Sequence, residues 1–166
     1  MATVTLQGNP MNTNGELPQV GVDAPAFNLT NGDLANVSLK DYLGKKCLLN
    51  IVPSLDTPTC AASARKFNET VGERQDAVCL VISADLPFAQ SRFCSIEGLE
   101  NVYGLSMMKS KNFAKDYGVL ITDGPLEGLS ARAVVIVDEG GKVIYTQLVP
   151  EIADEPDYDA AMQALG

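Results

Sequence analysis

The sequence contains no histidine, and this absence narrows the chemistry open to the protein. Ser-His and Cys-His relays are excluded, as are metal sites that need an imidazole ligand. Basic residues are also scarce: 12 Lys and Arg stand against 21 Asp and Glu, which gives a formal net charge of −9. That charge opposes approach to phosphate backbones and anionic lipid, so we expect no nucleic-acid partner and no membrane partner.

Long apolar runs are missing as well. No stretch of the sequence approaches the roughly 20 residues that a membrane-spanning helix needs. The first residues, MATVTLQGNP, have neither the basic nor the apolar region of a secretory signal, so we expect a cytoplasmic protein. A length of 166 residues with 46% hydrophobic content predicts a single domain over residues 1–166, since a chain of this size can bury a full core alone.

The four cysteines contain no C-x-x-C pair; they are Cys47, Cys60, Cys79 and Cys94. This spacing argues against a thioredoxin-type dithiol and against zinc, although a four-thiolate zinc site built from distant cysteines stays an alternative. In the cytosol most thiols stay reduced, so the even number of cysteines does not predict a disulfide scaffold. Each cysteine must be judged by its local sequence.

Alternating apolar segments predict an α/β fold. We expect a β-hairpin over residues 3–15, strands at 47–52, 77–82, 102–105, 133–137 and 143–148, and helices at 37–42, 58–71, 111–117 and 157–165. Another helix should begin after Asp85, the candidate N-cap, and carry Cys94. This order predicts parallel central strands, an antiparallel closing hairpin and flanking helices, which is a thioredoxin-like arrangement.

The most informative segment is PSLDTPTC at residues 53–60, where a predicted buried strand passes into a helix. Thr57 suits the N-cap position and Pro58 the first helical position, so Cys60 falls in the first turn. Its sulfur would face unpaired backbone N–H groups and the positive end of the helix dipole, which favour the thiolate. The segment therefore predicts a reactive cysteine, although a small buried hydrophobe is the alternative.

The pattern P-x-x-x-T-x-x-C, formed by Pro53, Thr57 and Cys60, resembles the peroxidatic motif of peroxiredoxins. The runs PSLDTPTCAASARKFN, SADLPFAQSRFC and YGVLITDGPLEGLSARAVVIVDE resemble the bacterial thiol peroxidase subfamily, of the atypical 2-Cys type. The likeness covers nearly the whole chain. It implies a thioredoxin-like (peroxiredoxin) fold, with a central mixed sheet flanked by helices and an N-terminal β-hairpin.

The resemblance also implies roles for individual residues. Cys60 would be the peroxidatic cysteine, which becomes a sulfenic acid, and Cys94 the resolving cysteine, which closes an intrachain disulfide. Arg132 would hold the thiolate and the peroxide, Thr57 would hydrogen-bond the sulfur and the substrate, and Pro53 would shield the site. The protein would reduce hydrogen peroxide and organic hydroperoxides, with thioredoxin as reductant, as a homodimer without metal or organic cofactor.

Other interpretations stay open. Cys94 could be a packed core cysteine, and Arg132 an ordinary salt-bridged arginine. Cys47 and Cys79 lie in strongly apolar segments, so we expect unreactive thiols there. The protein could also be a disulfide oxidoreductase on the same fold, or a redox sensor without catalytic turnover. If Cys60 and Cys94 do pair, their positions on different helices should require local unwinding.

Overall fold

The computed structural model describes residues 1–166 and contains two sheets. The smaller sheet pairs β1 (Thr3–Leu6) with β2 (Asn9–Asn12). The larger sheet contains β3 (Asn28–Thr30), β4 (Asn36–Ser38), β5 (Lys46–Ile51), β6 (Ala77–Ser83), β7 (Val102–Ser106), β8 (Ala133–Val137) and β9 (Val143–Leu148). The α-helices are α1 (Pro58–Val71), α2 (Pro87–Glu97), α3 (Asn112–Asp116) and α4 (Tyr158–Leu165).

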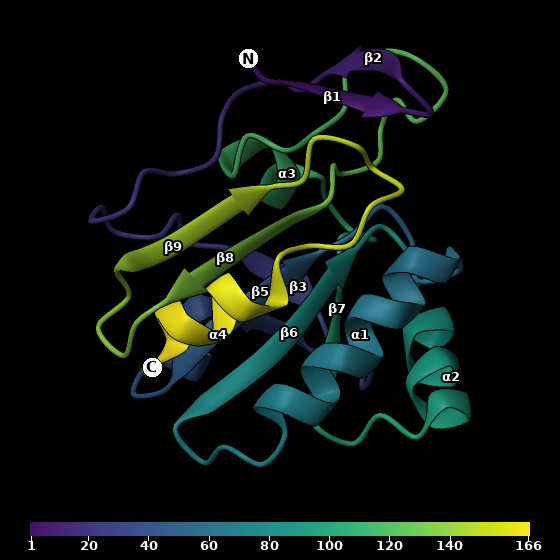
Figure 1. Cartoon of the computed structure of the whole chain (residues 1–166). Coiled ribbons are helices and arrows are strands. Elements are labelled where there is room, and N and C mark those ends of the chain that lie inside the picture. Colours follow the sequence, from purple (N-terminus) through teal and green to yellow (C-terminus); the bar gives the residue numbers. More distant parts are fainter.

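The larger sheet is mixed, in the order β4-β3-β7-β6-β5-β8-β9. Strand β6 runs parallel to β5 and β7, whereas β8 pairs antiparallel with both β5 and β9. Figure 1 shows the hairpin of β1 and β2 beyond one end of this sheet. The predicted thioredoxin-like fold with parallel central strands and an N-terminal β-hairpin is therefore confirmed.

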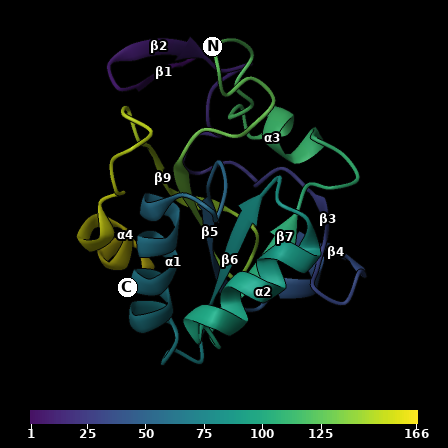
Figure 2. The same cartoon turned by 90° about the vertical axis from the view of Figure 1, so that its right-hand side faces the viewer.

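Helices cover both faces of the sheet, because β5 and β6 are apolar on both faces. Helices α1 and α4 pack on one face, in a cluster with Cys60 and Cys79. Helix α3 and the 3-10 helix η1 (Leu39–Tyr42) pack on the other face, in a cluster with Cys47. Figure 2 shows α1 and α4 on one side of the sheet and α3 on the other. None of the helices is both long and apolar enough to span a membrane.

Two local predictions are wrong. The segment 37–42 is not one helix: Val37 and Ser38 belong to β4, and only the 3-10 turn that follows is helical. Asp85 is not the N-cap of α2, since Leu86 occupies that position and provides no side-chain hydrogen bond. The carboxylate of Asp85 is instead engaged by hydroxyl and backbone N–H donors that come before α2.

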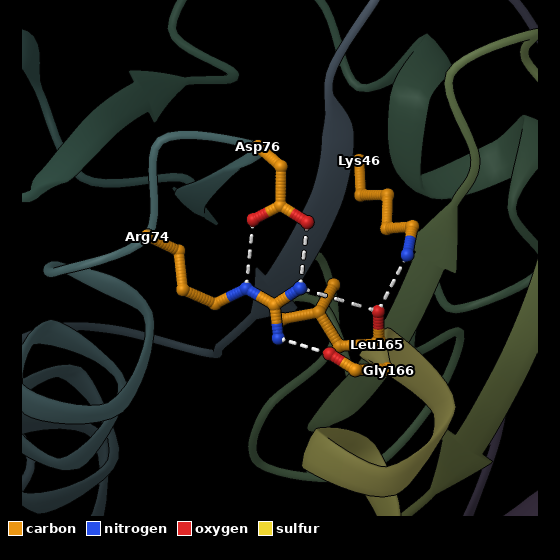
Figure 3. A network of polar contacts seen from close by, with 5 residues as sticks. All are labelled: Lys46, Arg74, Asp76, Leu165 and Gly166. Carbon is orange, nitrogen blue, oxygen red and sulfur yellow. Dashed lines mark hydrogen bonds and ion pairs between the residues drawn. The ribbon is translucent and has the colours of Figure 1, made fainter.

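The last turn of α4 is held to the start of β5 and to the connection that precedes β6 (Figure 3). Lys46 Nζ donates to Leu165 O at 2.8 Å, and Arg74 Nη1 donates to Gly166 O at 2.6 Å. Arg74 is itself held by two hydrogen bonds to Asp76. Cations suit the negative end of a helix dipole. This anchor lies at the opposite end of β5 from the segment that leads to Cys60.

Candidate active site

Cys60 lies in the first turn of α1, directly after the loop that follows β5. Thr57 Oγ1 accepts a hydrogen bond from Cys60 N at 3.4 Å and donates one to Ser54 O at 3.1 Å. Pro58 occupies the first helical position, so the predicted start of this helix is confirmed. The side chain of Cys60 is fully buried.

Arg132 immediately precedes β8, and the antiparallel pairing of Ala133 with Ile51 brings it beside the segment that leads to Cys60. Arg132 as a whole residue is 2% exposed. Nη1 donates to Cys60 Sγ at 3.2 Å, and Nε donates to Ile152 O at 2.9 Å. None of the three ion pairs of the structure includes Arg132, so no carboxylate neutralises this buried charge. It can therefore stabilise negative charge on the sulfur.

A cavity of about 230 Å³ opens beside this pair. Arg132 and Thr57 line it, and both contact Cys60. The remaining wall is mainly apolar and includes Leu6, Pro53, Leu126, Leu129 and Ile152. The cavity thus combines a cationic donor and a hydroxyl with apolar sides, and its size suits a small molecule.

The N-terminal hairpin helps to build this cavity through Glu151. The Glu151 carboxylate accepts hydrogen bonds from Thr5 Oγ1 at 2.5 Å and Gln7 N at 2.9 Å. These bonds, that of Thr5 above all, lower the pKa of Glu151 to about 2. The neighbouring Ile152 carbonyl then faces Arg132. No pattern in the sequence predicts this contact, since any residue can supply a backbone carbonyl.

Cys94 is on α2, away from the cavity beside Cys60. It is half-buried and lines a separate surface hollow of about 360 Å³, together with Gln90 and Tyr103. Burial raises the pKa of the Cys94 thiol. All four cysteines are free thiols. The structure therefore brings Pro53, Thr57, Cys60 and Arg132 together, and leaves Cys94 apart.

The other two cysteines lie inside the sheet. Both Cys47 and Cys79 are at most 1% exposed. Burial raises the pKa of both thiols, that of Cys47 to about 11. Such thiols are weak nucleophiles at neutral pH. No three His, Cys, Asp or Glu side chains of the structure form a cluster that could hold a metal ion.

Comparison with known proteins agrees with this geometry. The redoxin family model matches residues 19–162. The chain belongs to the redoxin family. The thiol peroxidase of Mycobacterium tuberculosis (strain H37Rv) is 55% identical to this redoxin over 166 residues, covering 100% of this chain and 99% of that protein. The thiol peroxidase of Corynebacterium glutamicum is 54% identical over 165 residues, with 99% of each chain covered.

A solved structure extends the likeness to three dimensions. A peroxiredoxin-like protein from Aquifex aeolicus superimposes with a TM-score of 0.93 at 41% identity, covering 99% of this chain and 96% of that one. Together with the full-length identity above, this match confirms the predicted membership of the thiol peroxidase subfamily of peroxiredoxins.

Proposed function

We propose that this redoxin is a thiol-dependent peroxidase that uses Cys60 as its nucleophile. The observation that carries the proposal is the 3.2 Å contact between Arg132 Nη1 and Cys60 Sγ, at the first turn of α1 and beside a small cavity. Backbone N–H groups and a guanidinium both stabilise a sulfur anion. The same donors would stabilise charge that develops on the peroxide oxygens during O–O cleavage.

The reaction divides into three steps. The Cys60 thiolate attacks one peroxide oxygen, the O–O bond breaks, and the leaving oxygen takes a proton, which gives Cys60 sulfenic acid and water or an alcohol. The Cys94 thiol then attacks the sulfenic sulfur, which forms the Cys60–Cys94 disulfide and releases water. An external dithiol, for which we propose thioredoxin, reduces this disulfide and becomes oxidised itself.

Two further residues would shape the first step. Thr57 lines the cavity with its hydroxyl and caps α1, so it would hydrogen-bond the substrate and fix the first turn. Pro53 is buried and lines the same cavity, where it would shield the sulfur from water. Holding the reacting oxygen in line with the sulfur removes much of the entropic barrier.

Disulfide formation should require a rearrangement of α2. Cys60 is only two residues into α1, about 3 Å along its axis, whereas Cys94 is seven residues into α2, about 10 Å along its axis. Both helices start at the carboxyl ends of neighbouring parallel strands. Disulfides join Cα atoms about 4.4 to 6.8 Å apart. We therefore propose that local unwinding brings the two cysteines together.

The apolar walls of the cavity favour organic hydroperoxides. Leu6 comes from the N-terminal hairpin, Leu126 and Leu129 come from the connection between α3 and β8, and all three line the space beside Arg132. An alkyl or aryl group buried against them would add apolar burial, which hydrogen peroxide cannot offer. Both would be substrates, and a lower KM for cumene hydroperoxide than for hydrogen peroxide is the measurement that supports this preference.

We also propose a homodimer located in the cytoplasm. Helix α2 exposes Phe88 and Ile96, at 64% and 70%, next to Leu86 at 51%. Apolar side chains gathered in this way are typical of an interaction surface. A cytoplasmic location fits a cycle that consumes thiol reductant. Sedimentation equilibrium of the reduced protein would test the dimer, because a monomeric mass at micromolar concentration contradicts it.

The decisive experiment is intact mass and thiol counting after stoichiometric hydroperoxide. The wild type should lose two hydrogens and two thiols. Cys94→Ser should gain one oxygen at Cys60 or form an intermolecular disulfide, and Cys60→Ser should stay unmodified. With a recycling dithiol, the wild type should consume excess peroxide rapidly, whereas Cys60→Ser and Cys94→Ser should not. Cys79→Ser is the matched control and should behave as the wild type.

Each alternative has its own result. If Cys60→Ser reacts as fast as the wild type, Cys60 is not the nucleophile and the proposal is wrong. If the wild type oxidises once but does not turn over with a dithiol, it is a redox sensor. Reduction of insulin without peroxide would identify a disulfide oxidoreductase.

A further inference from the structure

The loop before Cys60 and the segment before α2 meet at Asp85, which lies between β6 and α2. On the side of the loop, Asp85 Oδ1 accepts from Ser54 Oγ at 2.7 Å and Oδ2 accepts from Leu55 N at 2.8 Å. Both donors lie in the turn that leads into α1. Hydrogen bonds to a carboxylate are stronger than those between neutral groups. Asp85 therefore holds this turn in place.

The contact continues to Cys60 itself. Ser54 O accepts from Thr57 Oγ1, and Thr57 Oγ1 accepts from Cys60 N. The position of Ser54 thus determines where the Thr57 hydroxyl lies, and with it the cap of the turn that carries the thiol. Asp85 reaches Cys60 through this short series of hydrogen bonds without touching it.

On the other side, Asp85 is connected to α2. Ser83 Oγ donates to Asp85 Oδ2 at 2.7 Å and accepts from Gln90 Nε2 at 3.0 Å. Gln90 is 2% exposed and lies one turn before Cys94. Gln90 Nε2 also donates to Leu105 O at 3.0 Å, but Gln90 Oε1 is buried without a hydrogen-bond partner, so only the NH₂ end of this side chain is attached. An incomplete attachment favours release of α2 at this end.

We propose that Asp85 is a positioning residue that couples the two cysteine-bearing segments of the proposed peroxidase. With α2 folded, Asp85 holds the Ser54–Leu55 turn and Cys60 is set for reaction with peroxide. When the first turns of α2 unwind toward disulfide formation, Asp85 moves with them and releases that turn. The displacement that frees Cys94 thereby also frees Cys60. The expected effect on the rate of Cys60 oxidation rests on the proposed function, whereas the coupling of the two segments through Asp85 does not.

Asp85→Asn tests the coupling with little change in shape. An amide is neutral and has one acceptor oxygen, so if its NH₂ group faces Leu55 N that bond is lost, and if it faces Ser54 Oγ the hydroxyl must turn round to accept. In either orientation the bonds between residue 85 and the turn lose the carboxylate charge, so the turn should be held less strongly. The matched control is Asp138→Asn, since Asp138 also accepts hydrogen bonds from two donors, Gly140 N and Lys142 N, at the turn between β8 and β9.

Hydrogen–deuterium exchange of the reduced proteins tests the coupling between the two cysteine-bearing segments without any peroxide. In Asp85→Asn, exchange should accelerate both at Leu55 and the first turn of α1 and at the amides of residues 88–94 in α2. Asp138→Asn should change only its own turn. Acceleration limited to one of the two cysteine-bearing segments, or to neither, overturns the coupling, whatever the catalytic activity of the protein.

Rapid quenching at increasing times separates the two chemical steps. In Asp85→Asn, oxidation of Cys60 by peroxide should slow about tenfold, as expected for a lost hydrogen bond to a charged group, while disulfide formation stays as fast as in the wild type or faster. A variant that was merely unstable would slow both steps. Equal slowing of both steps therefore overturns the inference, whereas absence of Cys60 oxidation in the wild type would overturn the proposed function.

Discussion

Helices α1 and α2 follow neighbouring parallel strands and each carries one of the cysteines, yet the protein holds them very differently. Helix α1 has 14 residues, a Thr57 cap and five buried side chains, among them Cys60, Phe67 and Val71. Helix α2 has 11 residues, no side-chain cap, and only Pro87 and Gln90 buried. Figures 1 and 2 show the two helices side by side.

The difference in packing corresponds to a difference in stability. Full burial of a Phe or Val side chain contributes about 1.5 to 3 kcal/mol, and α1 buries both Phe67 and Val71 in this way. The ion pair that joins the helices, Arg65 with Glu97, has side chains 47% and 30% exposed, so it adds at most about 1 kcal/mol. Helix α1 thus suits a step that needs a fixed sulfur, and α2 a step that needs movement.

The largest effect should come from Arg132→Lys, which changes the residue that contacts the cysteine of α1. Lysine keeps the charge but lacks the planar fork that donates to both Ile152 O and Cys60 Sγ. We expect oxidation of Cys60 by peroxide to slow about 100-fold, as for loss of a transition-state donor. Because the chain has no tryptophan, rapid quenching with intact mass spectrometry is the suitable measurement.

Arg65→Lys is the matched control, since Arg65 lies on α1 but makes an exposed ion pair. Cys60 of the Arg65→Lys variant should be oxidised by peroxide as fast as Cys60 of the wild type. Disulfide formation after oxidation should be unchanged in Arg132→Lys, because that step depends on α2. Wild-type oxidation rates in Arg132→Lys, with its fold intact by circular dichroism, would show that the guanidinium does not assist the reaction.

A smaller effect should follow from giving α2 the cap that it lacks, with Leu86→Asp. Aspartate at an N-cap stabilises a helix by about 1 kcal/mol, and the acidic charge adds to this at the helix N-terminus. If unwinding of α2 precedes disulfide formation, that step should slow about fivefold, the factor that corresponds to about 1 kcal/mol. More Cys60 should then be oxidised to sulfinic acid at high peroxide concentration, which intact mass would detect.

Leu86→Ala separates the cap from the loss of an exposed apolar side chain. It removes the leucine without adding an acceptor, so disulfide formation should keep its wild-type rate or accelerate. If Leu86→Asp and Leu86→Ala slow the step equally, the cap is irrelevant and the leucine itself matters. Thermal unfolding of both variants checks that α2 has been stabilised only by the aspartate.

The sequence predicted most of α1 and less of α2 for a physical reason. The apolar spacing of α1 and its Thr-Pro start are local signals, and the structure confirms both. For α2, Asp85 lies two residues before Pro87 and suits an N-cap by type, but its carboxylate accepts hydrogen bonds from distant donors at Ser54 and Leu55. Tertiary contacts of this kind leave no periodic pattern in a sequence.

The residues of the candidate site also divide into those that the local sequence predicts and those that depend on tertiary contacts. Cys60 and Thr57 follow from the strand-to-helix junction, whereas Arg132 came only from resemblance, because its approach depends on the pairing of β8 with β5. The contribution of Glu151 and of the Ile152 carbonyl was not predicted. Their place beside the cavity depends on where the N-terminal hairpin docks, and local propensity does not determine docking.

The smallest expected effect concerns the pH dependence of disulfide formation. The pH at which its rate stops rising reports whether α2 is folded or unwound when Cys94 reacts. Burial in α2 raises the pKa of Cys94, and the rate of attack follows the fraction of thiolate. If Cys94 reacts from the folded helix, the rate should keep rising with pH beyond the ordinary cysteine pKa of about 8.5. If α2 unwinds first, exposure returns the thiol to its ordinary pKa and the rate levels near that pH.

We expect the rate to level near the ordinary cysteine pKa. The measurement quenches the wild type and Cys94→Ser at matched times after oxidation. Cys94→Ser cannot form the Cys60–Cys94 disulfide, so it gives the background signal. Leu86→Asp should then give lower rates at every pH with an unchanged midpoint, because a cap reduces the unwound population without altering the thiol inside it. A midpoint that moves upward in the capped variant would mean that Cys94 reacts while α2 is still folded, and the contrast between the two helices would not govern the second step.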